Sequence, residues 1–422
     1  MKILLSGGNV FDNNSFFKKD VAVTDGVISE IAPEISASDF DIVFDVKDKF
    51  IVPGFVDVHV HLREPGFSYK ETIKTGTLAA AKGGYSTVCS MPNLNPAPDN
   101  FENIMIQKQI IDETASVSVY PYATITKGRK GIGELTDFDE LSDIAIAFSD
   151  DGTGVQTEEL METAMEKAKA LGKIIAAHCE DERLLLGGYI HDGEYAKTHG
   201  HKGISSASEW TQIKRDIELA KKTGCKYHVC HISTKESVEL IRKAKQEGVD
   251  ITCETGPHYL VLCDEDLQES GSFKMNPPLR SKADREALIE GICDGTIDMI
   301  ATDHAPHSKE EKSKGLDGSA MGIVGLETAF GVLYTHLVQK GIISLEKLVN
   351  LMSINPAKRF EIENRLEVGK IANFAVLDTK SQYIVKPHTF LSKGRSTPFE
   401  NMVLCGENIL TLAKGKIAWR KK

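Results

Sequence analysis

The sequence predicts an α/β chain in two parts, a (β/α)8 TIM-like barrel and a small β-sandwich domain formed by both chain ends. Across residues 53–364, apolar runs alternate with helical patterns, which is typical of parallel βα units. Across residues 1–52 and 365–422, short β-like runs are instead separated by turn residues. The middle segment is somewhat longer than the roughly 250 residues of a typical eight-fold barrel.

The two terminal segments share the same β-like character. The strands expected there are Ile3–Leu5, Val21–Val23, Val27–Ile31, Ile42–Val46, Phe374–Leu377, Met402–Leu404, Ile409–Leu412 and Lys416–Trp419. The segment between them instead alternates strand-like and helix-like patterns. We therefore expect residues 1–52 and 365–422 to assemble into one composite domain.

The middle segment supplies the expected barrel elements. Its strands are Phe55–His59, Ser86–Cys89, Ile174–His178, Lys226–His231, Asp250–Glu254 and Met299–Asp303. Its helices are Glu71–Lys82, Glu158–Leu171, Ala207–Thr223 and Lys235–Glu247. An open doubly wound sheet is the alternative fold, but no GxGxxG-type phosphate turn follows an early strand.

The composition restricts the partners of the chain. Of 422 residues, 41% are hydrophobic and 26% charged, as in soluble globular proteins, and the net charge is −11. That charge disfavours nucleic acid and anionic membranes, which both demand a basic surface. The start MKILLSGG is too short an apolar run for a signal peptide or a membrane span. Eight cysteines without a CxxC pair indicate reduced thiols, so we expect a cytoplasmic protein.

Two histidines end the first expected barrel strand, at the face where βα barrels place their chemistry. His59 and His61 lie two residues apart, so both point to the same side of the strand. Two neighbouring imidazoles suit a zinc-like metal. Taken alone, the pair is explained equally well as packed or exposed histidines.

Other strand ends carry similar side chains. His178, His231 and Asp303 end three further strands, and Asp150 and Asp151 close the run 147–152. Each one alone is more simply a hydrogen-bonded polar group. Together they predict a two-metal site with a bridging carboxylate and a bridging hydroxide, because buried charges persist when they are paired or metal-bound. Strand alternation leaves open which of the two adjacent aspartates is the bridge.

The motifs around these residues resemble the amidohydrolase superfamily, and most closely its class I bacterial dihydroorotases. The matching stretches are Pro53–Gly66, Ser90–Asn93, Phe148–Gly152, His178–Asp181, His231–Thr234, Asn276–Arg280 and Ala301–His307. The resemblance covers nearly the whole chain. Tyr259 and Met321 depart from the family pattern, which often has histidine and proline there, but neither is an expected ligand.

The resemblance implies a reaction and a set of site residues. The reaction is the reversible hydrolysis of (S)-dihydroorotate to N-carbamoyl-L-aspartate in UMP biosynthesis, with two zinc ions per chain. The metal ligands it implies are His59, His61, Asp151, His178, His231 and Asp303. The side chains it places against substrate are Arg63, Asn93, Asn276 and His307. Asp151 would be the bridge, and Asp303 the general acid and base.

Several alternatives remain open at this point. Hydantoinases, dihydropyrimidinases and allantoinases share the fold but typically bridge their metals with a carbamylated lysine, and no lysine lies near Asp150 and Asp151. A non-catalytic scaffold would be expected to lose ligands that this chain retains. The small-molecule substrate is the expected partner, and a homodimer or association with aspartate transcarbamoylase stays possible. The polar segment Ser308–Gly325 is either a mobile lid or an ordinary loop.

Overall fold

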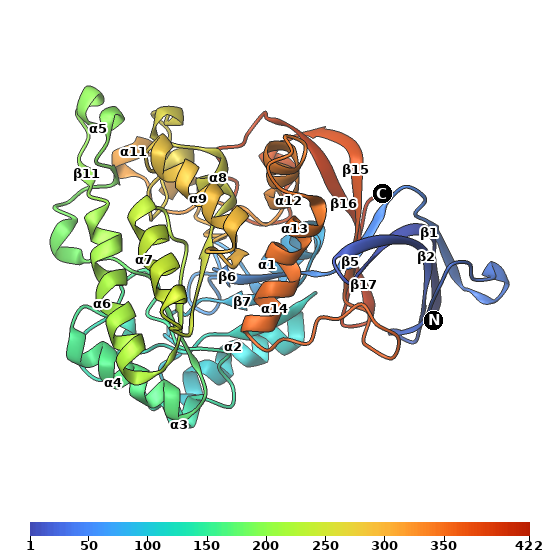
Figure 1. Ribbon diagram of the computed structural model, residues 1–422, viewed down its shortest axis with the longest axis horizontal. Helices are drawn as coiled ribbons and strands as arrows, with labels where there is room; N and C mark the ends of the chain where they lie inside the picture. Colours follow the sequence, from blue (N-terminus) through green and yellow to red (C-terminus); the bar gives the residue numbers. More distant parts are fainter.

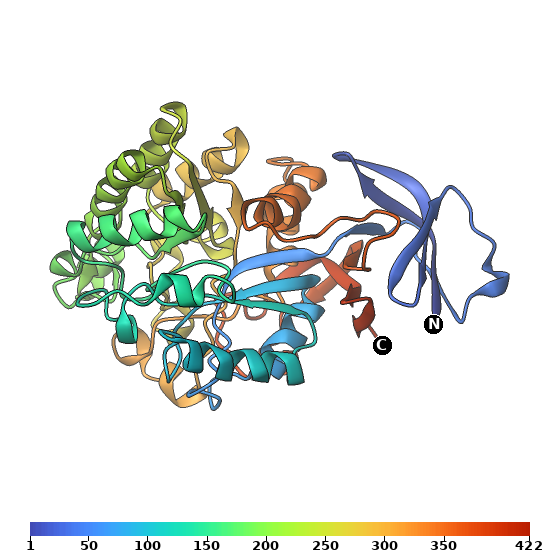
Figure 2. The ribbon, with the colours of Figure 1, turned by 90° about the horizontal axis from the view of Figure 1, so that it is seen from below.

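The computed structural model describes residues 1–422 and divides into a barrel and a sheet part lying side by side (Figures 1 and 2). Both chain ends lie in the sheet part, and the C-terminal strands lie between the barrel and the N-terminal strands (Figure 1). No helix combines the length and the apolar composition that a membrane span requires.

The barrel strands run parallel and form a ring. They are β6 (Phe55–Val60), β7 (Tyr85–Ser90), β8 (Ser118–Pro121), β9 (Ile174–Ala177), β12 (Lys226–Val229), β13 (Ile251–Thr255) and β14 (Met299–Ile300). Ladders join β6-β7-β8 and β9-β12-β13-β14. Phe148 bridges Ala123 beyond β8 to Ile175 of β9, and Val60 bridges to His304 beyond β14. These single bridges connect the two ladders at both ends, which confirms the predicted barrel class.

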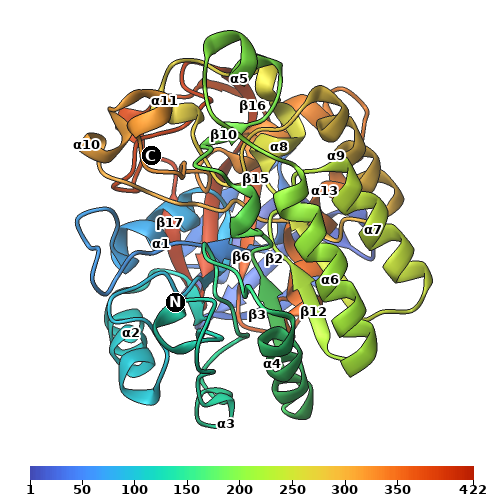
Figure 3. The same ribbon diagram turned by 90° about the vertical axis from the view of Figure 1, so that its left-hand side faces the viewer.

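Helices surround this ring (Figure 3). The longer ones are α1 (Ile73–Lys82), α2 (Phe101–Thr114), α4 (Glu158–Ala170), α6 (Ala207–Thr223), α7 (Lys235–Gln246) and α9 (Lys282–Asp294). Shorter ones are α3 (Phe138–Leu141), α5 (Glu194–His199), α8 (Pro257–Val261), α10 (Lys309–Lys312), α11 (Gly315–Gly318), α12 (Ala329–Leu333), α13 (Leu345–Val349) and α14 (Asn355–Arg359). A two-residue pair, β10 (Ile190–His191) and β11 (Gly203–Ile204), lies outside the ring.

Helix α4 illustrates why these segments form. The side chain of Thr157 accepts a hydrogen bond from the backbone N–H of Leu160, and two glutamates in the first turn suit the positive end of the helix dipole. Its buried residues recur at helical spacing and are Met161, Ala164, Met165 and Ala168. One face therefore packs on the barrel strands while the opposite face meets solvent.

The sheet part is one hydrogen-bonded sheet built from both chain ends. Its strands are β1 (Lys2–Asp12), β2 (Ser15–Thr24), β3 (Val27–Ala32), β4 (Ile42–Asp45), β5 (Phe50–Pro53), β15 (Phe374–Ile384), β16 (Val403–Ala413) and β17 (Lys416–Arg420). The order is β17-β16-β15-β5-β1-β2-β3, with β4 paired to β1. Ile3, Val21, Phe374 and Leu410 meet in one buried cluster, so both ends share a core. The division into 1–52 plus 365–422 and 53–364 remains our proposal.

Some element bounds differ from the sequence expectation. The expected strands Met402–Leu404 and Ile409–Leu412 are parts of the single strand β16, which begins at Val403 and in which Gly406 has a φ of +82°. β5 and β8 lie outside the expected set. β14 ends at Ile300, because its pairing with β13 stops at Thr255 and the backbone turns to a positive φ at Asp303.

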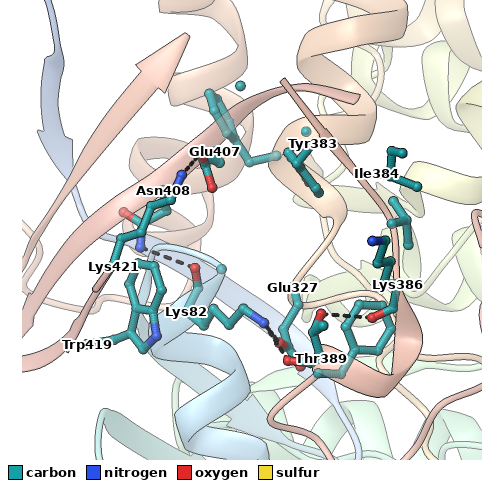
Figure 4. Close-up of a pocket in the computed structure, with 16 residues that line it drawn as sticks. Lys82, Glu327, Tyr383, Ile384, Lys386, Thr389, Glu407, Asn408, Trp419 and Lys421 are labelled. Carbon is teal, nitrogen blue, oxygen red and sulfur yellow. Dashed lines mark hydrogen bonds and ion pairs between the residues drawn. The ribbon is translucent and has the colours of Figure 1, made fainter. Parts of the chain in front are cut away.

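A hollow of about 270 Å³ lies where the barrel meets the sheet (Figure 4). Lys82 at the end of α1 pairs with the buried carboxylate of Glu327 at 2.7 Å. Tyr383 of β15 packs so closely on Gly331 that a Cβ there would lie 2.3 Å from the tyrosine hydroxyl. These contacts fix the sheet against the barrel.

Candidate metal centre

A second cavity, of about 230 Å³, lies at the carboxyl ends of the barrel strands. Nine of the ten side chains expected at the site line it: His61, Arg63, Asn93, Asp151, His178, His231, Asn276, Asp303 and His307. The tenth, His59, is fully buried, and its Nε2 lies 3.4 Å from Asp151 Oδ1. The structure therefore brings these ten side chains together.

Strand ends and unusual backbone angles aim these side chains. His59 lies within β6, and His178 directly follows β9. His231 and Asp303 follow β12 and β14 and have φ angles of +30° and +46°. Non-glycine residues rarely adopt positive φ, and such strained positions concentrate at functional sites.

Asp151 lies at the centre of the histidines. Its Oδ1 lies 3.5 Å from His231 Nε2 and 3.7 Å from His178 Nδ1, and its Oδ2 lies 3.6 Å from His61 Nε2. Two groups of possible ligands, His59–His61–Asp151 and Asp151–His178–His231, therefore share this carboxylate. Asp303 also lies next to the two histidines of the first group. Its Oδ1 lies 3.0 Å from His61 Nε2 and 3.5 Å from His59 Nε2.

The neighbouring Asp150 has a different role. Its carboxylate accepts hydrogen bonds from the backbone N–H groups of Ile125, Thr126 and Gly131 and from the Thr126 hydroxyl. By contrast, Asp151 Oδ1 has no hydrogen-bond partner. Of the two adjacent aspartates, only Asp151 faces the histidines.

The donor atoms in this cluster fit a metal centre. His59 Nε2 and Asp151 Oδ1 are buried without a hydrogen-bond partner, although such groups are nearly always satisfied in folded proteins. Burial alone would raise the pKa of Asp151, but the nearby charges of His59 and His61 hold that pKa well below its usual range. Imidazole nitrogens around an ionised carboxylate form a donor set typical of zinc.

The substrate-side residues present free hydrogen-bonding atoms. Arg63 Nε donates to Pro306 O at 3.2 Å, and burial lowers the pKa of Arg63 to about 10, which keeps the guanidinium charged at neutral pH. Asn93 Nδ2 donates to Asp151 O at 2.9 Å, and Asn276 Nδ2 donates to Glu180 Oε1 at 3.0 Å. The Oδ1 atoms of both asparagines are buried without a partner.

His307 borders the cavity but is engaged within the protein. Its Nε2 lies 2.8 Å from Met321 O, a pure acceptor, so Nε2 carries the proton. Its Nδ1 can then accept from Lys70 Nζ at 3.3 Å. Burial and the charges of Arg63 and Lys70 lower the pKa of His307 to about 3. The ring is therefore neutral, and its one N–H is already used.

The segment after His307 packs against the cavity. Within it, Met321 and Gly322 line the cavity wall. The buried Lys312 Nζ donates to Lys274 O at 3.0 Å and to Ala320 O at 2.7 Å. This ties the segment to the chain just before Asn276. A lid movement of Ser308–Gly325 remains a hypothesis.

Sequence reasoning missed two contributors to the site. Arg129 Nη1 donates to Asp151 O at 2.5 Å and to Thr153 Oγ1 at 2.6 Å. Glu254 Oε1 lies 2.7 Å from His59 Nδ1. A signal for Glu254 was present, because it ends an expected strand as the other site residues do.

Comparisons with known proteins show what this chain is similar to. A family profile described as dihydro-orotase-like matches residues 48–237. A dihydroorotase from Anoxybacillus flavithermus is 52% identical over 413 residues, covering 97% of this chain and 96% of that protein. One from Bacillus caldolyticus is 50% identical over 425 residues, covering 100% and 99%. Among solved structures, an L-hydantoinase (dihydropyrimidinase) from Arthrobacter aurescens superposes with a TM-score of 0.88 at 26% identity, covering 98% of this chain and 95% of that one.

Proposed function

This chain belongs to the dihydroorotase family, and from that premise we propose that it opens the ring of dihydroorotate with two zinc ions held around Asp151. The family's reaction is the reversible hydrolysis of a cyclic amide, which yields N-carbamoyl-L-aspartate in pyrimidine biosynthesis. The observation that carries the proposal is one buried carboxylate shared by two groups of histidines at the cavity floor.

The distances around Asp151 support the two ligand sets that we propose. His59, His61 and Asp303 would hold one ion, and His178 and His231 the other, with Asp151 shared between them. When bound in pairs, such ions lower the pKa of water from 15.7 to about 7 and polarise a carbonyl oxygen. The protein contributes a buried and pre-arranged donor set.

In this proposal Asp303 moves the proton. Burial alone would raise the pKa of Asp303, but the hydrogen bond from His61 and the charges of His59 and His61 lower that pKa below its usual value. The side chain is therefore an ionised carboxylate at neutral pH. It would accept the proton of the attacking water and deliver it to the departing ring nitrogen.

Arg63, Asn93 and Asn276 would orient the substrate. The Arg63 guanidinium presents a planar fork that matches a carboxylate at two points. Asn93 keeps one amide hydrogen beyond its bond to Asp151 O. Asn276 Nδ2 donates to Glu180, so Asn276 Oδ1 would be left to accept a hydrogen bond from a ring N–H of the substrate.

His307 has a conditional part in this proposal. Its N–H donates to Met321 O, so it could donate to the substrate carboxylate only after that bond opens. Its Nε2 lies 3.3 Å from the Arg63 guanidinium, where it limits the positions that Arg63 can take.

The direct test is hydrolysis by the purified protein. Loss of the ultraviolet absorbance of dihydroorotate should be fast, while dihydrouracil and hydantoin, which lack the carboxylate, should react poorly. A preference for either of the latter two would instead favour hydantoinase chemistry, which the fold also supports. A cytoplasmic location, and assembly as a homodimer or with an aspartate transcarbamoylase, also belong to the proposal.

A further inference from the structure

The ring of His59 is held by a carboxylate on the side that faces away from the other proposed ligands. Its Nδ1 lies 2.7 Å from Glu254 Oε1, and both side chains are fully buried. An ionised carboxylate only accepts, so the proton of His59 lies on Nδ1. Nε2, which lies 3.4 Å from Asp151 Oδ1, is then the nitrogen that would bind a metal.

Glu254 also contacts the second half of the cluster. The same Oε1 accepts from the backbone N–H of His231 at 3.2 Å. Its Oε2 accepts from His228 Nε2 at 3.1 Å, and His228 Nδ1 lies 2.9 Å from Thr252 Oγ1. One carboxylate at the end of β13 therefore connects ligands assigned to both ions.

The other three histidines lack such support. Their remaining ring nitrogens, His61 Nδ1, His178 Nε2 and His231 Nδ1, are buried without a hydrogen-bond partner. The carboxylate nearest to His178 Nε2 is that of Glu180, at 3.5 Å. Among the four rings, only His59 has its orientation and tautomer fixed by a hydrogen bond from its outer nitrogen.

We propose that Glu254 is a positioning residue of the metal centre, which fixes the tautomer of His59 and the backbone of His231 and so raises the affinity for both ions. This inference rests on the proposed two-metal function. Outer hydrogen bonds of this kind orient a ligand histidine and increase its basicity, and their loss typically lowers metal affinity about 10–100-fold.

The test compares zinc binding by Glu254→Gln and Glu254→Ala. The glutamine side chain would keep the shape and can still accept from His59, so the affinity of that variant should fall less than that of the alanine variant. Zinc affinity would be measured on metal-stripped protein by competition with a coloured chelator, together with the number of ions bound. Thermal unfolding of the metal-free proteins would check their folding.

Glu71→Gln is the matched control. Glu71 is a fully buried glutamate that faces a histidine, His304, which is not a proposed ligand. We expect about 10–100-fold weaker zinc binding for Glu254→Ala, a smaller loss for Glu254→Gln, and wild-type affinity for the control. The inference is overturned if both Glu254 variants bind zinc as wild type does, or if Glu71→Gln loses as much affinity as Glu254→Gln. Wild-type protein that binds no zinc would instead overturn the proposed centre itself.

Discussion

Asp303 Oδ1 lies 3.0 Å from His61 Nε2, which joins the side chain following the last barrel strand to the one following the first. A second contact reinforces this closure, because Asp57 of β6 accepts hydrogen bonds from the backbone N–H and hydroxyl of Thr302. The two residues His61 and Asp303 lie 242 positions apart in the chain, so the site exists only when the ring of strands is closed.

Asp303→Asn should abolish most turnover while keeping the fold. An amide oxygen can still face the ligands, but it cannot accept and return a proton. General acid–base groups typically contribute 10²–10⁴-fold, so we expect a loss of about that size in kcat. The measurement is the rate of dihydroorotate hydrolysis with zinc content determined on the same sample. A variant that stays within a few-fold of wild type would remove Asp303 from the mechanism.

The two adjacent aspartates should behave differently when each is changed to asparagine. Asp151→Asn should lose zinc, because its carboxylate is the one shared by both groups of histidines. Asp150→Asn should keep zinc but lose stability by about 1–3 kcal/mol, because an amide nitrogen would face donors of the loop that Asp150 holds. Elemental analysis and urea unfolding distinguish the two outcomes. If Asp150→Asn were the variant that lost zinc, the assignment of the bridge would be wrong.

Several elements could be predicted because local signals agree. The bounds of α6 match the expectation, since its apolar periodicity is clear and Gly224 ends it in a left-handed conformation. α2 was not expected, because its apolar residues do not mark a single buried face. Phe101 and Met105 are 44% and 38% exposed. β5 is a four-residue run, too short to be distinguished from the strand that follows it.

The site residues were accessible to sequence reasoning because motifs mark the strand ends. What remained open depended on contacts between distant segments. The loop at Thr126 binds Asp150 and so leaves Asp151 to face the histidines. The alternation of side chains along a strand carries no information about such a loop. The engagement of His307 depends on Met321 O, and the support of His59 depends on Glu254, 195 positions away. Neither pairing leaves a local pattern.

The stability of the segment beside the cavity should depend on pH through Lys312. Burial lowers the pKa of Lys312 in the folded protein to about 7, from about 10.5 for an exposed lysine. Between these values the unfolded chain binds the proton and the folded protein does not. This lysine's contribution to stability therefore rises with pH from about 7 to about 10.

Removal of Lys312 should flatten that dependence. In urea unfolding, wild type should gain stability relative to Lys312→Met as the pH rises from about 7 to about 9. Lys309→Met, at an exposed position of the same helix, is the control and should follow wild type. A constant difference between wild type and Lys312→Met across this range would contradict the prediction.

The junction in Figure 4 should depend on Glu327 more than on its partner Lys82. Glu327 Oε1 accepts from the backbone N–H groups of Leu391 and Ser392 at 2.8 and 3.1 Å, and its side chain is 3% exposed. Glu327→Ala leaves both N–H groups unsatisfied and should cost about 3–5 kcal/mol of unfolding free energy. Lys82→Met should cost less, because its side chain is 25% exposed and the two N–H groups still hold the carboxylate. Equal losses in urea unfolding would contradict this ranking.

The last prediction concerns Arg63 and the choice of substrate. If Arg63 binds the substrate carboxylate, Arg63→Met should greatly slow the hydrolysis of dihydroorotate. A charge-assisted pair is roughly twice as strong as a neutral hydrogen bond. Removing one partner of a buried pair costs about 3–5 kcal/mol, which corresponds to a loss of about 10²–10³-fold or more in kcat/KM.

Dihydrouracil is the control substrate, because it is the same ring without the carboxylate. Wild type should hydrolyse it very poorly, and Arg63→Met should lose little of that residual rate, so the effect appears as a difference between two substrates. Asn276→Ala should lower both rates, because the ring N–H that its free Oδ1 is proposed to bind is present in both substrates. If Arg63→Met lost activity equally on both substrates, Arg63 would not bind the carboxylate of dihydroorotate. The proposed specificity would then fail while the metal centre, tested separately by zinc content, would stand.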